Sequence, residues 1–208
     1  MHISWLGGTT VKIVTKAWDE DVTVVIDPYK PETGTTARSF SPQVAILTRG
    51  PEAGKDLITL SGEPFILNTP GECDIKGVLI TAVGGNEPGT TMIRLDAEGL
   101  SVAHLGLATK SLNQKQREVL GDVDILFVPV GGINGYDVEA AVKAVSDIEA
   151  RIVIPVAHRS DNDPTAAPVA DFCKAMGVPL TGEPETKVII KKKDLPTEDT
   201  SVIVLAKE

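Results

Sequence analysis

The first half of the chain is a succession of short β-type segments, and this pattern constrains the fold more than any other feature. Residues 22–26, 44–47 and 78–83 are rich in β-branched residues and are bounded by Gly, Pro, Asn or Asp, which favour turns. Residues 19–21 and 96–99 are typical of hairpin tips. Parallel strands need long crossovers, usually helices, and this half shows no helical pattern. We therefore expect antiparallel strands there.

The second half changes to an alternation of strands and helices. Residues 123–130 and 152–156 are nearly continuous apolar runs, typical of strands covered on both faces. Helices are predicted over 111–120, with Ser111 as N-cap, over 138–148 and over 167–176. The middle helix has one apolar face, formed by Val138, Ala141, Val142, Val145 and Ile148. Two sheets with helices outside them follow, so we predict an α/β fold, a four-layer αββα sandwich, as a single domain over residues 1–208.

Charge and the rare residue types exclude several kinds of site. The 29 acidic and 20 basic residues give a net charge of −9, which repels nucleic acid and anionic membranes. The lysines at 191–193 are interpreted as a solvated turn. Cys73 and Cys173 form no CxxC motif and are expected to be reduced thiols, and the three histidines form no HExxH motif. With no apolar run of transmembrane length and no signal-peptide pattern, we expect a cytoplasmic protein.

Several stretches resemble one known family. They are residues 3–7 (ISWLG), 26–29 (IDPY), 44–48 (VAILT), 70–78 (PGECDIKGV), 104–106 (HLG), 124–132 (DILFVPVGG) and 152–155 (IVIP). Their order is similar to that of the metallo-β-lactamase superfamily, most closely its short prokaryotic metal-dependent hydrolases related to ascorbate-phosphate lactonases. The resemblance covers residue 3 to about residue 176. It implies the αββα fold and hydrolysis assisted by Zn or Mn.

The chain departs from this family where the metal should bind. The family's signature is T-H-x-H-x-D-H, and the same register here reads TRGPEAG over residues 48–54. The ligand positions that we can align carry side chains that cannot bind such a metal: Arg49, Pro51, Ala53, Gly54, Leu107 and Ala157. Gly8 also replaces the histidine that follows the family's first strand. We therefore expect no metal cofactor and no hydrolysis by the family's mechanism.

Asp27, Glu72, His104 and His158 are the remaining candidates for a catalytic role. Asp27 should lie near the former metal site, where the resemblance implies that it orients a histidine ligand. Arg49 carries a permanent charge about where the cation would lie, so we expect it to pair with Asp27 or Glu72.

The two later histidines are interpreted mainly as structural residues. His104 matches a family residue outside the ligand set, and we expect a hydrogen-bonded core histidine. His158 lies one position after the ligand register, so its side chain should face away from the site, as a surface or cap residue. A local bulge would reverse that orientation.

Three functions remain open. The first is a non-catalytic homologue that binds a small ligand or a protein partner. The second is a metal-dependent hydrolase with a remodelled site, built from the four candidates or from a weakly bound Mg or Mn held by oxygen ligands. The third is a regulatory subunit of an active homologue. A homo-oligomer is compatible with each of these, and the sequence identifies no substrate.

Overall fold

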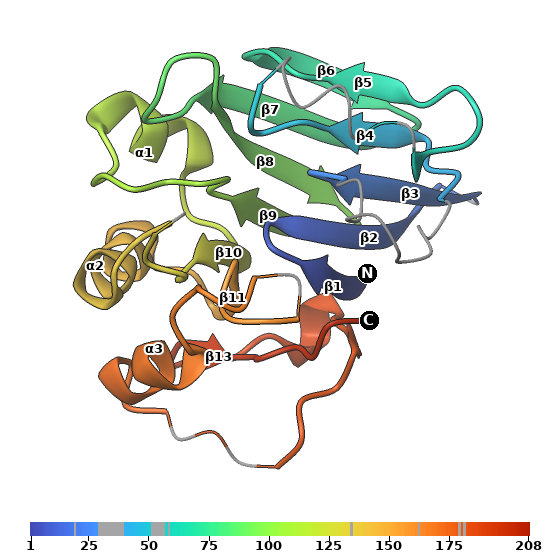
Figure 1. Cartoon of the computed structure of the whole chain (residues 1–208). Helices are drawn as coiled ribbons and strands as arrows, with labels where there is room; N and C mark the ends of the chain where they lie inside the picture. The colour runs from blue at the N-terminus through green and yellow to red at the C-terminus, as the bar shows by residue number, and fades with distance from the viewer. Residues whose placement is uncertain are drawn as a thin grey trace.

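Two β-sheets packed face to face form the body of the molecule (Figure 1). The computed structural model describes residues 1–18, 20–28, 40–50, 57, 59–133, 135–161, 163–178, 180 and 182–208. In this part of the chain, one sheet has the order β12-β1-β2-β3-β4-β5 and the other has the order β13-β11-β10-β9-β8-β7-β6. The two packed sheets of the predicted α/β sandwich are present.

The six-stranded sheet is built mainly from the first half of the chain. Its strands are β1 (His2–Gly7), β2 (Thr10–Ala17), β3 (Glu20–Ile26), β4 (Val44–Ile46), β5 (Phe65–Leu67) and β12 (Lys187–Ile189). The strands β1, β2 and β3 form the expected antiparallel meander. However, β3, β4 and β5 pair in parallel, so the expectation of antiparallel strands is wrong for these pairs. Strand periodicity does not reveal strand direction, which is why the sequence did not predict this.

The seven-stranded sheet joins an antiparallel half to a parallel half. The antiparallel strands are β6 (Gly71–Ile75), β7 (Val78–Gly84), β8 (Thr91–Ala97) and β9 (Leu100–His104). The parallel strands are β10 (Ile125–Pro129), β11 (Ile152–Val156) and β13 (Ser201–Val202). All residues of β10 and β11 are buried, as their apolar runs predict. This parallel half is where the predicted strand–helix alternation occurs.

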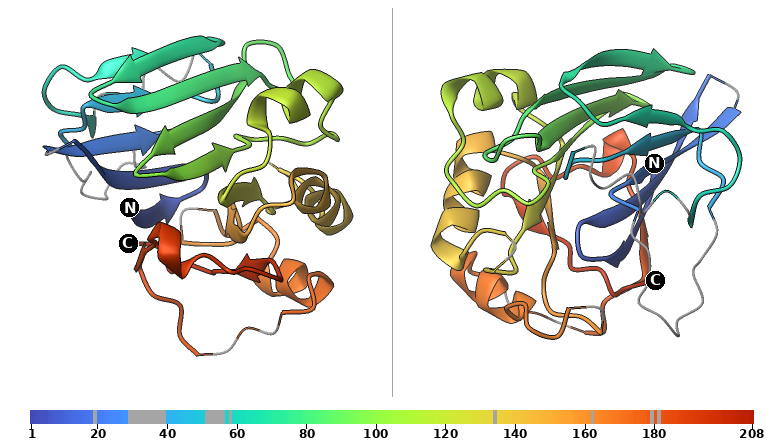
Figure 2. Two further views of the ribbon diagram at one scale, coloured as in Figure 1. Left: turned by 180° about the vertical axis from the view of Figure 1, so that it is seen from behind. Right: turned by 45° about the horizontal axis from the view of Figure 1, so that its top comes forward.

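The three described α-helices pack against the seven-stranded sheet (Figures 1 and 2). They are α1 (Gln114–Leu120), α2 (Val138–Ile148) and α3 (Val169–Ala175), and a short 3-10 helix covers Lys192–Asp194. Asn113, not Ser111, caps α1, because its side chain and that of Gln116 form a capping box. Asp137 caps α2. Among the described residues, no α-helix covers the outer face of the six-stranded sheet.

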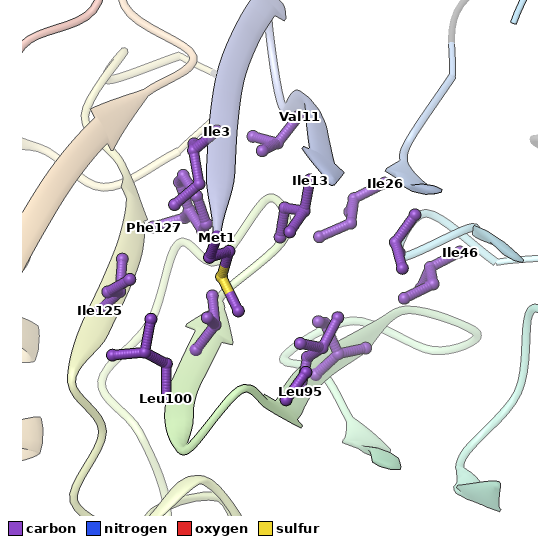
Figure 3. Packing of buried hydrophobic residues seen from close by; sticks show 14 of the residues in the cluster. Met1, Ile3, Val11, Ile13, Ile26, Ile46, Leu95, Leu100, Ile125 and Phe127 are labelled. Atoms are coloured by element: carbon purple, nitrogen blue, oxygen red, sulfur yellow. The ribbon is translucent and has the colours of Figure 1, made fainter. Parts of the chain in front are cut away.

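The main hydrophobic core lies between the two sheets (Figure 3). Ile13 and Ile26 project from the six-stranded sheet towards Leu95 and Phe127 of the seven-stranded sheet. A second core lies beneath the helices, where Phe172 of α3 is fully buried. Cys73 and Cys173 are free thiols, as expected. No described helix has the length and apolar character that spanning a bilayer requires.

Replacing Ile13 with alanine should strongly destabilise the fold. Ile13 is completely buried, so Ile13→Ala removes packed methyl groups and leaves a cavity, at a cost of about 2–5 kcal/mol in the free energy of unfolding. Ile133→Ala is the matched control, because Ile133 is exposed and should change this value by less than about 0.5 kcal/mol. Urea denaturation measures both, and equal losses would contradict the assignment of the core.

Candidate functional site

The ends of several strands and turns meet at one edge of the sandwich. The turn between β1 and β2, the residues after β3 and β4, and the residues after β9 and β11 are joined there by hydrogen bonds. These positions correspond to the segments at which the sequence resemblance implies a metal site. The geometry of this edge therefore decides what chemistry the site can perform.

Asp27 is the centre of this hydrogen-bond network. Its residue is 1% exposed and has a φ of 48°, which turns the chain sharply after β3. The backbone amide of Thr48 donates to Oδ1 of Asp27 at 2.7 Å, and the Thr48 hydroxyl donates to Oδ2 at 2.5 Å. The Thr10 hydroxyl donates to the Asp27 carbonyl oxygen at 2.6 Å. Both carboxylate oxygens are thus occupied by protein donors.

Arg49 lies against the same carboxylate. Its Nε atom is 4.0 Å from Oδ1 of Asp27, and a terminal guanidinium nitrogen donates to the carbonyl oxygen of Pro28 at 3.3 Å. The Arg49 side chain is 31% exposed, so it lies at the rim and does not extend into bulk solvent. Of the two partners expected for Arg49, the structure has Asp27. Glu72 lies exposed on β6, an edge strand, and no ion pair between it and Arg49 is present among the described residues.

His104 is a hydrogen-bonded core histidine, as predicted. Its Nδ1 accepts a hydrogen bond from the Gly106 amide at 3.0 Å, so Nε2 carries the proton and donates to the Thr9 carbonyl oxygen at 3.0 Å. Burial lowers the pKa of His104, and the charge of Asp27 opposes that shift only in part. The ring is therefore neutral near pH 7, and neither nitrogen is available to a substrate.

His158 is buried, so the prediction of a surface or cap residue is wrong. It is 5% exposed, and its ring stacks on Trp5 with centroids 4.2 Å apart. The preceding residue, Ala157, has a φ of 57°, a left-handed conformation that redirects the chain after β11. Nδ1 of His158 lies 3.3 Å from the Arg159 carbonyl oxygen, and Nε2 has no hydrogen-bond partner among the described residues. Burial lowers the pKa of His158.

The other aligned ligand positions provide no donor that the structure can place. Pro51, Ala53 and Gly54 lie outside the described residues. Leu107 is half-buried in the turn after β9, and the Ala157 amide donates to the Gly8 carbonyl oxygen at 2.7 Å. Within the described ranges, no three His, Cys, Asp or Glu side chains converge on a point.

A catalytic divalent ion does not fit this set of residues. Such an ion needs several neutral imidazoles or carboxylates around it. Here both oxygens of Asp27 and both nitrogens of His104 are already bonded, and a guanidinium lies beside Asp27. The residues described at this edge therefore do not support a reaction step through a metal.

Sequence reasoning missed Thr48 and Trp5. Thr48 is the first residue of the aligned signature, but only its hydroxyl and amide together explain how Asp27 is held. Trp5 contacts His158 across more than 150 positions of sequence, and its Nε1 donates to the Gly8 carbonyl oxygen at 2.8 Å. Nothing in the sequence signalled that contact.

Removing the Thr48 hydroxyl should cost more stability than removing the Arg49 charge. Thr48→Val deletes a hydrogen bond to a buried carboxylate, for which we expect a loss of about 1.5–3 kcal/mol. Arg49→Met removes a long, partly exposed ion pair, worth about 1 kcal/mol or less. Thr23→Val on β3 is the matched control, since no hydrogen bond of its hydroxyl is present within the described residues. Urea denaturation at neutral pH gives the order, and the reverse order would show that Arg49 is the main partner of Asp27.

His158→Phe should flatten the pH dependence of stability. The unfolded histidine binds a proton near pH 6.5, whereas the folded one does so only at a lower pH because its pKa is lowered. The contribution of His158 to the free energy of unfolding is therefore present in full above about pH 6.5. It is lost as the pH falls towards the pKa of His158 in the folded state. Urea denaturation from about pH 7.5 to about pH 5 tests this, and a wild-type slope retained in the variant would contradict it.

Comparisons with known proteins identify the architecture. A family model described as the beta-lactamase superfamily domain matches residues 2–157. A Thermotoga maritima protein described as a candidate zinc-dependent hydrolase of the metallo-β-lactamase superfamily is 23% identical, with a TM-score of 0.77, 99% of this chain and 98% of that chain being covered. A metallo hydrolase from Ignicoccus hospitalis is 15% identical, with a TM-score of 0.63 and coverages of 91% and 99%. An isothiocyanate hydrolase from Delia radicum gut bacteria is 11% identical, with a TM-score of 0.61 and coverages of 100% and 97%.

The structural similarities show the fold, and the family match extends over most of the chain. The resemblance inferred from the sequence motifs is thereby confirmed. The chain belongs to the metallo-β-lactamase superfamily.

Proposed function

We propose that this chain is a non-catalytic member of its superfamily, which uses the fold to bind a small ligand or a protein partner. The observation that carries the proposal is the contact between Arg49 and Asp27. Arg49 occupies the first aligned ligand position, and its guanidinium lies 4.0 Å from a carboxylate whose two oxygens Thr48 already satisfies.

The physical argument concerns both the ion and the nucleophile. Hydrolysis of the family's kind requires a metal that lowers the pKa of a bound water and polarises the bond to be cleaved. A permanent guanidinium charge beside Asp27 repels a second cation. Both ring nitrogens of His104 are hydrogen-bonded, so this histidine has no free nitrogen to act as a general base. These features favour binding over hydrolysis.

The alternative is a metal-dependent hydrolase with a remodelled site. It is favoured by the similarity to the Thermotoga maritima and Ignicoccus hospitalis proteins, whose descriptions name hydrolases. The free Nε2 of His158 is the observation within the chain that fits it best, because an unprotonated imidazole nitrogen is a metal ligand. We rank it second, since no further donors join His158 in the described ranges.

The setting that we propose is the cytoplasm, with no nucleic acid or membrane as partner. Free cysteine thiols are compatible with a reducing compartment, and the charge of −9 disfavours polyanions over the surface as a whole.

Purified protein should contain no stoichiometric zinc or manganese. Elemental analysis after dialysis tests this, together with thermal unfolding in the presence of Zn, Mn or Mg, for which we expect no saturable rise in the melting temperature. An ion that binds the folded state at a concentration of 100 Kd would add about 2.7 kcal/mol to its stability, which a melting curve detects. One equivalent of metal, lost in His158→Ala and in Asp27→Asn but kept in the control His2→Ala, would establish the alternative.

A further inference from the structure

The outer face of the six-stranded sheet carries a cavity of about 560 Å³. Its walls come from β1, β2, β3, β12, the turn after β8 and the C-terminal segment. No described α-helix covers this face, whereas α1, α2 and α3 cover the other sheet (Figure 2). The cavity shares no lining residue with the Asp27 network, so it is independent of the function proposed above.

A cationic row crosses the floor of this cavity. Ser4 of β1 is paired with Lys12 of β2 on one side and with Lys187 of β12 on the other. Directly paired residues project to the same face of a sheet, so Ser4 is flanked on this face by two lysine side chains. Ser4 is 2% exposed and lines the cavity, but its hydroxyl makes no hydrogen bond to the rest of the described chain. The Ser4 hydroxyl faces the cavity, and a hydroxyl donor flanked by two lysines suits an anionic group.

The row beside the cationic one has an apolar residue on each side of His2. Two residues along β1 from Ser4, His2 is paired with Val14 of β2 and Ile189 of β12. Residues two apart on a strand share a face, so this row adjoins the first. Ile189 is among the exposed large apolar residues of the structure. The cavity thus joins a cationic end to an apolar patch.

Glu98, one of the acidic residues that line the cavity, accepts hydrogen bonds from neighbouring donors. Glu98 accepts hydrogen bonds from the α-ammonium of Met1 at 2.8 Å, from the Thr15 hydroxyl at 2.8 Å and from the Lys16 amide. Burial would raise the pKa of Glu98, but these hydrogen bonds outweigh it and hold the pKa below its usual value. Glu98 therefore remains ionised and committed to the wall of the cavity.

The lysines are less completely compensated. Glu208 pairs with Lys12 at 3.4 Å, and Asp21 lies opposite Lys16 in the ladder. No ion pair joins Lys187 to any residue in the described ranges. In a chain with a net charge of −9, this is a local excess of positive charge.

We propose that this cavity binds a small organic anion, with its carboxylate or phosphate group on Lys187, Ser4 and Lys12. Its apolar portion lies over Val14 and Ile189. The bound anion displaces the Glu208 carboxylate from Lys12. That exchange is easy, because a long and partly exposed ion pair contributes little free energy.

Calorimetric titration with octanoate and with octyl phosphate tests the class of ligand. We expect saturable binding of at least one of these anions, and the tighter one identifies the acidic group that the site prefers. Octylamine and octanol, which share the apolar chain but lack the negative charge, should not bind saturably. Absence of saturable binding for both anions, or equal binding of octanol, would overturn the proposal.

Variants locate the binding in this cavity. Lys12→Ala combined with Lys187→Ala should weaken binding about tenfold or more, and Ser4→Ala should weaken it severalfold. Glu208→Gln should tighten binding, because it removes the competing carboxylate. Lys115→Ala on α1 is the matched control, an exposed lysine far from this sheet face, and should leave the affinity unchanged.

Melting curves show whether each variant is folded. If the double lysine variant unfolds, Glu208→Gln still decides the question, since a surface carboxylate unrelated to the ligand would not change its affinity. Unchanged affinity in Glu208→Gln, or in a folded double lysine variant, would overturn the proposal.

Discussion

The burial of the Asp27 carboxylate is the constraint on which the candidate site depends. A charge removed from water must be hydrogen-bonded or paired, or its desolvation would oppose folding. Thr48 supplies both hydrogen bonds and Arg49 adds a positive charge, so the end of β3 is tied to the end of β4. The Thr10 hydroxyl extends the network to β2 through the carbonyl oxygen of Asp27. Donors from the chain itself therefore join these segments at the edge of the sandwich.

This compensation bears on whether the edge of the sandwich needs an ion to satisfy its polar groups. In a metal site, convergent carboxylates and imidazoles repel or leave one another unsatisfied unless a cation lies between them. At this edge, Asp27 and His104 have partners from the chain itself. His158 is the exception, because its Nε2 is buried without a partner among the described residues. A ligand that bonds to Nε2 of His158 would therefore satisfy a buried polar atom that the described residues leave without a partner.

The uneven covering of the two sheets separates the molecule into two kinds of surface. The helices bury the outer face of the seven-stranded sheet in a second apolar core. The outer face of the other sheet keeps polar and apolar residues that alternate with inward-facing ones. On β2, Lys12 and Val14 lie on that face and alternate with buried Val11, Ile13 and Thr15. A net charge summed over the chain does not reveal such a local cationic region, because electrostatic recognition depends on where charges are placed.

Much of the fold followed from sequence patterns whose physical basis is local. The apolar runs that became β10 and β11, the Asp137 cap and the inward face of α2 were predictable, because side-chain period and capping chemistry act over a few residues. The sequence also showed that Arg49 stands at an aligned ligand position, and it left Asp27 and Glu72 as alternative partners, of which the structure has Asp27. The parallel direction of β4 and β5 could not, because pairing partners lie far apart in the chain.

Sequence and tertiary structure likewise each determined part of the candidate site. The sequence determined which chemical groups were candidates for the site, namely two carboxylates, one guanidinium and two imidazoles. Only the tertiary structure decided that Arg49 lies against Asp27 and that His158 is buried against Trp5. The reason is that one left-handed residue, Ala157, redirects the chain after β11, and a backbone conformation of that kind at a non-glycine residue is selected by surrounding contacts and not by local propensity.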